Sequence, residues 1–151
     1  LVKDANESSA IPKHVLAILI KMGIEPECDP TLSEYSLIID AMIGYGLTGD
    51  PRPPISDWVT RANASHTPIL ALDAPTGLNA TTGFPSPICI RATITLTLAL
   101  PKIGLMTPEA KPFVGDLYLA DISVPPELYT SPSLGLGVIS PFNTEPIIKL
   151  L

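Results

Sequence analysis

Positive charge is scarce in this sequence of 151 residues. It contains 9 Lys and Arg against 15 Asp and Glu, which gives a formal net charge of −6. Because binding to a phosphate backbone depends on clustered positive charge, this composition argues against a nucleic-acid partner. A small-molecule ligand is the favoured alternative.

Long hydrophobic runs are missing as well. The longest one, residues 15–20, falls far short of the ~20 residues that cross a bilayer, so no membrane partner is expected. Residues are 46% hydrophobic and 16% charged, a balance that argues against disorder. A chain of this length fits one domain, residues 1–151, which buries roughly 70% of the surface that its unfolded form exposes.

Cysteine is rare too, with Cys28 and Cys89 as the two thiols. They lack the spacing of metal ligands, and no signal peptide stands before them. We therefore expect a reduced intracellular setting, in the cytoplasm or in an organelle if the source is eukaryotic.

The apolar patterns predict an α/β domain. Near-continuous apolar runs of strand length alternate with amphipathic segments, which indicates a mostly parallel sheet with right-handed crossovers. The expected strands are residues 36–43, 68–74, 92–100 and 116–122, and the expected helices are residues 11–22, capped by Gly23, and 54–64. Residues 131–151 show no clear period and form either a tail or a short terminal element.

In two of the expected strands an apolar run ends in an aspartate, Asp40 or Asp73, and glycine-bearing turn sequence follows. The carboxyl edge of such a sheet is where α/β folds bind ligands, so the two carboxylates are expected to share one polar site. Asp40 lies in apolar sequence and needs compensation, from a ligand or from backbone hydrogen bonds. Asp73 either carries chemistry or caps a turn.

The residues after Asp40 and those after the third expected strand add polar groups to this edge. The loop after Asp40 has three glycines, Gly44, Gly46 and Gly49, which allow close backbone approach to a phosphate or simply a tight turn. Lys102 follows a strongly apolar strand, where it either points into a polar cleft or marks the exposed strand end.

Four segments, residues 36–50, 69–77, 98–105 and 115–126, together resemble the YjeF N-terminal domain family. The active members of this family are NAD(P)H-hydrate epimerases, and the resemblance spans residues 36–130. It implies a three-layer Rossmann-like α/β fold. The family's Asn- and Gly-rich phosphate-binding segment is absent from these residues, so we expect the N-terminal part of the domain to be missing from this chain.

The resemblance also implies a chemistry, the interconversion of the R and S forms of NADH or NADPH hydrated at C6. It assigns catalysis to Asp73 and Lys102. It assigns potassium to Asp40 and Thr76, where Thr76 stands in place of the serine of the family's Pro-Ser-Gly turn. It assigns substrate binding to Asp73 and to the loop Gly44, Tyr45, Gly46, Leu47, Thr48, Gly49 and Asp50.

Other functions remain open at this point. Relatives of the same fold serve as non-catalytic dimeric scaffolds in RNA decapping or as apolipoprotein-binding domains, and an unrelated α/β nucleotide-binding domain is a third alternative. Asp40, Asp73 and Lys102 together favour the enzyme, because a scaffold has no evident use for costly carboxylates at strand ends. The resemblance further implies a homodimer. We expect the chain alone to bind substrate poorly and to expose apolar sheet surface.

Overall fold

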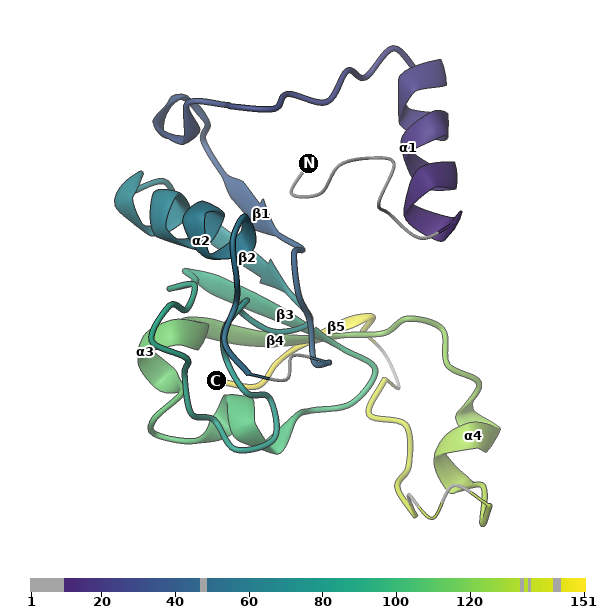
Figure 1. The fold of residues 1–151 in the computed structure, drawn as a ribbon. Helices are drawn as coiled ribbons and strands as arrows, with labels where there is room; N and C mark the ends of the chain where they lie inside the picture. Colours follow the sequence, from purple (N-terminus) through teal and green to yellow (C-terminus); the bar gives the residue numbers. More distant parts are fainter. Residues whose placement is uncertain (1–9, 47–48, 134, 136, 143–144) are drawn as a thin grey trace.

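The computed structural model describes residues 10–46, 49–133, 135, 137–142 and 145–151. A five-stranded sheet forms its centre (Figure 1). The strand order is β1-β2-β3-β4-β5, with bounds Ile38–Asp40, Ile69–Leu72, Ile94–Leu98, Asp116–Ala120 and Ile147–Lys149. The first four strands pair in parallel, and β5 pairs antiparallel to β4. The predicted α/β fold with a mostly parallel sheet is confirmed.

The strands are shorter than the apolar runs that predict them. The expected strand 36–43 is paired only from Ile38 to Asp40, because the backbone N–H of Met42 already turns back to the Asp40 side chain. The expected strand 92–100 is paired from Ile94 to Leu98 and ends where Ala99 adopts a positive φ of 63°. Apolar character thus continues into the turns that follow the strands.

Two longer helices occur where the periodicity places them. Helix α1, Ala10–Lys21, is followed by Gly23, whose φ of 79° lets the Ile24 N–H reach the Leu19 carbonyl as in a Schellman cap. Helix α2, Ile55–Ala64, lies in the connection between β1 and β2. The remaining helical segments are short: η1 Leu32–Glu34, η2 Ile103–Met106, α3 Lys111–Val114 and α4 Pro126–Thr130.

The core lies on one face of the sheet. Ala71, Thr95 and Leu117 are register partners in β2, β3 and β4, so their side chains point to the same side. Val59 of α2 packs in the cluster with Ala71, and Val114 of α3 packs in the cluster with Leu117. Helices α2 and α3 therefore cover this face, and Figure 1 draws both on that side of the sheet.

The opposite face is less covered. Ile39 is 58% exposed and Ile94 is 37% exposed, whereas buried parallel sheets normally have both faces covered. Helices α1 and α4 lie apart from the strands (Figure 1). The exposed apolar sheet surface expected from the sequence is present.

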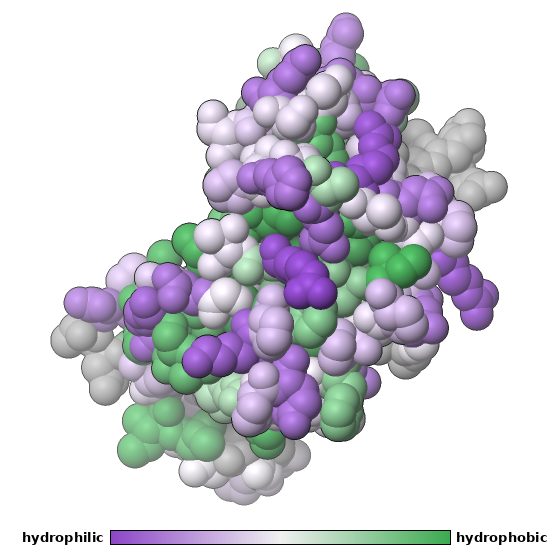
Figure 2. Space-filling view, turned by 90° about the vertical axis from the view of Figure 1, so that its left-hand side faces the viewer, coloured by the Kyte–Doolittle hydropathy of each residue, from purple (hydrophilic) through white to green (hydrophobic). Residues whose placement is uncertain are grey.

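Apolar groups also reach the surface on the side of α2 and α3. Figure 2 shows them there between hydrophilic side chains. Among the described residues, none of the helices has the length and apolar character needed to cross a bilayer.

Strand β5, residues 147–149, pairs with the sheet along β4. Ile147, Ile148 and Lys149 pair with Ala120, Leu119 and Tyr118, and the Leu150 N–H donates to the Leu117 carbonyl. Of the two alternatives for residues 131–151, a tail or a terminal element, the structure shows a terminal element at residues 147–149.

Candidate active site

Strands β2 and β3 end in the same unusual way. Asp73 has a φ of 70°, and the Ala74 N–H donates to the Leu72 carbonyl across it at 2.9 Å. Ala99 has a φ of 63°, and the Leu100 N–H donates to the Leu98 carbonyl at 2.8 Å. Both turns are three-residue turns of the classic γ type, which is rare and strained. Strained non-glycine residues cluster at functional sites.

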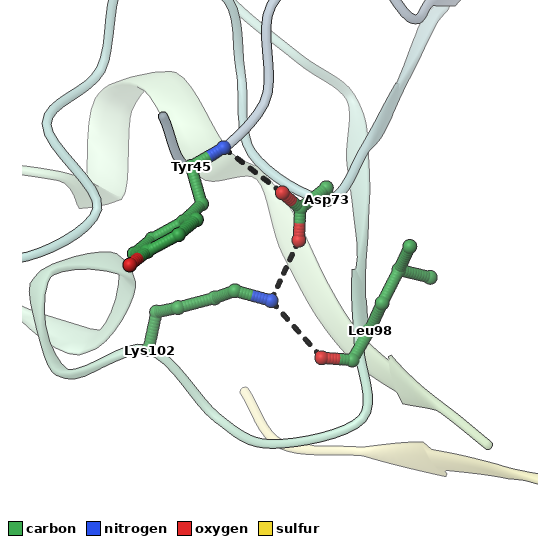
Figure 3. Close-up of polar contacts among 4 residues, drawn as sticks. All are labelled: Tyr45, Asp73, Leu98 and Lys102. Atoms are coloured by element: carbon green, nitrogen blue, oxygen red, sulfur yellow. Dashed lines mark hydrogen bonds and ion pairs between the residues drawn. The ribbon is translucent and has the colours of Figure 1, made fainter. Parts of the chain in front are cut away.

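The two strand ends join Asp73 to Lys102. Lys102 Nζ lies 2.6 Å from Asp73 Oδ1 and donates to the Leu98 carbonyl at 3.0 Å (Figure 3). The Lys102 side chain is only 18% exposed and the Asp73 side chain only 23%, so water screens the pair less than it would at the surface. Of the two alternatives for Lys102, an exposed strand end or a polar cleft, the structure shows the side chain turned inward toward a carboxylate.

The environment of Asp73 favours its ionised form. Partial burial acts to raise the pKa of its carboxyl group, but the hydrogen bond from Lys102, the backbone N–H of Tyr45 and the charge of Lys102 together hold the pKa below its usual value. Asp73 is therefore a carboxylate near neutral pH.

The glycine loop reaches Asp73 through its backbone. The Tyr45 N–H donates to Asp73 Oδ2 at 2.9 Å, while the Tyr45 side chain itself is exposed (Figure 3). A Cβ on Gly44 would stand 2.6 Å from Asp73 Oδ2, which is too close for any side chain to be accommodated without a shift. This explains a glycine at position 44.

The rest of the predicted substrate loop has a different setting. Gly46 is exposed, with open space where a Cβ would be. Gly49 and Asp50 line a hollow of about 200 Å³ together with Asn79, Thr82, Phe84, Pro85, Ser86 and Pro87. Leu47 and Thr48 lie outside the described residues.

Asp40 is buried beside Thr76. Its side chain is 2% exposed; Oδ2 accepts the Thr76 N–H at 2.8 Å, and Oδ1 accepts the Thr76 hydroxyl at 2.7 Å and the Met42 N–H at 3.3 Å. Burial raises the pKa of Asp40, although these hydrogen bonds act to lower it. Backbone hydrogen bonds, one of the two kinds of compensation expected for Asp40, are therefore present.

The oxygen atoms around Thr76 suit a hard cation. Its hydroxyl accepts the Ile43 N–H at 3.1 Å and lies 3.2 Å from the Ile43 carbonyl oxygen, so a carboxylate, a hydroxyl and a carbonyl are grouped here. Such donors are preferred by hard cations. Among the described residues, no group of three or more His, Cys, Asp or Glu could hold a metal ion.

Sequence reasoning missed the main-chain parts of this site. The Leu98 carbonyl and the Ile43 backbone make contacts that any residue type would offer, so no sequence signal marks them. A signal for Gly44 existed, but close approach to a side chain was not distinguishable from approach to a ligand.

Known proteins are similar to this chain in sequence and in fold. An epimerase of NAD(P)H-hydrate from Weissella koreensis is 35% identical over 131 residues, covering 85% of this chain and 59% of that protein. A second protein of that name, from Dehalogenimonas lykanthroporepellens, is 35% identical over 97% of this chain and 59% of its own length. The chain thus spans about three fifths of these relatives.

One solved structure, of a yeast protein, covers 95% of this chain and 62% of its own, with a TM-score of 0.70 and 19% sequence identity. It supports the fold. The sequence profile of the family described as YjeF-related protein N-terminus matches residues 2–104. With a profile match over most of its length and relatives at 35% identity, the chain belongs to this family.

Proposed function

We propose that this chain is part of an NAD(P)H-hydrate epimerase, the activity that the names of its relatives state. The single observation that carries the proposal is the partly buried Asp73–Lys102 pair at two adjacent strand ends. It supplies a carboxylate and a proton donor within one hydrogen bond of each other, which general acid–base chemistry requires. The substrate is a C6-hydrated NADH or NADPH.

The pair suggests a division of labour during epimerisation. As the C6–O bond breaks, the ring nitrogen lone pair forms a C=N⁺ bond and the departing hydroxide takes a proton from the Lys102 ammonium, leaving as water. The ionised Asp73 stabilises the positive ring. Water then adds to the other face of C6, and its proton returns to the Lys102 amine, which restores the starting state. Asp73 acts as carboxylate throughout, because its pKa is low.

Potassium is part of the proposal. Asp40 and Thr76 would hold the ion through the oxygens already grouped with the Ile43 carbonyl. Such an ion would supply positive charge near a buried carboxylate and near a loop that approaches the substrate phosphates. The backbone of the glycine loop, with Gly49 and Asp50 beside the hollow, would bind those phosphates.

The test is the interconversion of the two purified C6 epimers by the full-length protein, followed by chiral separation. Asp73→Asn removes the charge that stabilises the positive ring, so it is expected to lower kcat by about 10²–10³-fold with affinity changed less than about tenfold. Asp116→Asn is the matched control, because Asp116 forms the exposed ion pair with Lys149 at 3.3 Å. Full turnover by folded Asp73→Asn protein would reject the role of Asp73. Failure of the unchanged protein to interconvert the epimers would reject the proposed function and favour a non-catalytic scaffold.

A further inference from the structure

The turn that places Lys102 is held from outside the sheet by Tyr129. Tyr129 belongs to α4, is 2% exposed, and donates its hydroxyl to the Ala99 carbonyl at 3.3 Å. On the other side of the same residue, the Ala99 N–H donates to the Ala120 carbonyl of β4 at 3.0 Å. Ala99, the residue with the positive φ, is therefore fixed at both its N–H and its carbonyl.

The conformation of Ala99 decides where the Leu98 carbonyl points. That carbonyl accepts both the Leu100 N–H, which closes the turn, and Lys102 Nζ. A positive φ is unfavourable for alanine, so Ala99 would relax to ordinary backbone angles if the hydrogen bonds that hold it were lost. Relaxation would rotate the Leu98 carbonyl away and remove one of the two hydrogen-bond acceptors that orient Lys102.

Helix α4 is suited to act as a clamp because it is itself anchored. The Val138 N–H donates to the Tyr129 carbonyl at 3.3 Å, so a segment from beyond the helix holds the tyrosine backbone. The hydroxyl is the polar end of an otherwise buried ring, and such hydroxyl groups usually find a partner. Here that partner is the backbone of the turn after β3.

We propose that Tyr129 is a positioning residue, which holds the strained turn at Ala99 and thereby directs Lys102 onto Asp73. It acts through the backbone and touches neither substrate nor reacting atoms. The inference rests on the proposed function for its effect on turnover. Its structural part, the coupling of Tyr129 to the Asp73–Lys102 pair, is measurable in this chain without any activity.

The experiment follows the titration of the Asp73 carboxyl carbon by NMR in this chain. Lys102→Met removes the ion pair and defines the full upward shift of the Asp73 pKa. Tyr129→Phe keeps the buried ring and removes only the hydroxyl, and it is expected to produce a measurable part of that shift in the same direction. Tyr118→Phe is the matched control, because this ring on β4 packs under the Lys149 ammonium, 5.6 Å away, and should leave Asp73 unchanged.

A second variant distinguishes an effect on the Ala99 turn from a general loss of packing around Tyr129. Glycine adopts positive φ without strain, so Ala99→Gly added to Tyr129→Phe is expected to return the Asp73 titration toward that of the unchanged chain. In the full-length protein, Tyr129→Phe should lower kcat by roughly threefold to tenfold with KM within about twofold, since substrate contacts are kept.

Two results would overturn the inference in different ways. If Lys102→Met shifts the Asp73 pKa but Tyr129→Phe does not, or if Ala99→Gly fails to restore it, the tyrosine has no positioning role. If Lys102→Met itself leaves the Asp73 titration unchanged, the ion pair is absent in solution, and the proposed catalytic pair fails with it.

Discussion

The Lys102 ammonium and the Asp73 carboxylate, 2.6 Å apart, meet because parallel strands end at a common edge. Asp73 directly follows β2, and Lys102 lies a short turn after β3, the next strand of the sheet. Each strand brings its own γ-type turn, so the pair is determined by two strained backbone segments as well as by charge. The stability and ionisation of these residues can be tested independently of activity.

The ion pair predicts a pH-dependent contribution to stability. The pKa of Asp73 is lower in the folded state than its ordinary value of 3.8, so its stabilisation is present above that value and is lost as the pH falls through the folded-state pKa. We expect Asp73→Asn to be less stable than the unchanged chain from pH 5 to 7 by a constant amount. Below about pH 4 the difference should shrink, as measured by urea unfolding. A difference that persists undiminished at pH 2 would contradict this.

The Thr76 hydroxyl is predicted to be worth more than other buried threonine hydroxyls. It donates to the buried Asp40 carboxylate, so Thr76→Val should lower the free energy of unfolding by about 1.5–3 kcal/mol, the range for hydrogen bonds to charged groups. The control is Thr97→Val, because Thr97 Oγ1 is buried without a hydrogen-bond partner among the described residues. That change should be neutral or stabilising. Equal losses in the free energy of unfolding for the two variants would show that the hydrogen bond from Thr76 to Asp40 adds no extra stability.

Gly44 is predicted to be intolerant of a side chain, in contrast to Gly46. A methyl group at position 44 would meet Asp73 Oδ2 at 2.6 Å, while position 46 opens to free space. Gly44→Ala should lower the free energy of unfolding by about 1–3 kcal/mol, the cost typical of overpacking, and should perturb the NMR signal of the Asp73 carboxyl group. Gly46→Ala should do neither. Unfolding curves that coincide for the two variants would exclude the close approach.

Potassium is predicted to stabilise the fold specifically. Burial raises the pKa of Asp40 because the ionised carboxylate loses solvation, and a bound cation would offset part of that cost. Once potassium exceeds its Kd, each further tenfold increase should add about 1.4 kcal/mol to the free energy of unfolding. The measurement compares KCl with choline chloride at equal ionic strength. The increment should vanish in Asp40→Asn, and identical curves in the two salts would assign Asp40 a structural role alone.

The uncovered sheet surface predicts concentration-dependent self-association of this chain. Ile39 is 58% exposed on the edge strand β1, and charged residues at such positions blunt edge-to-edge pairing. Ile39→Lys should therefore raise the monomer fraction in light scattering. Ile139→Lys, at a position that is 82% exposed outside the sheet, controls for added charge. A monomer fraction that rises equally in both variants would point to net charge as the cause.

The sequence by itself determined the fold class and most of the candidate side chains. Apolar runs in the sequence predict buried parallel strands, and an amphipathic pattern with helical spacing predicts α2. Both patterns are local in the sequence. The placement of Asp40, Asp73 and Lys102 at strand ends follows from the same runs, because strand ends share one edge of a parallel sheet.

Tertiary structure alone decided how these groups interact. Whether Asp40 is compensated by Thr76, and whether Lys102 turns toward Asp73, depends on strand register and on turn angles that local sequence does not encode. No pattern in the sequence marks Tyr129, because its proposed role arises from a hydrogen bond to a main-chain carbonyl 30 residues away. Backbone groups are the same in every residue, so only the folded chain shows which of them meet.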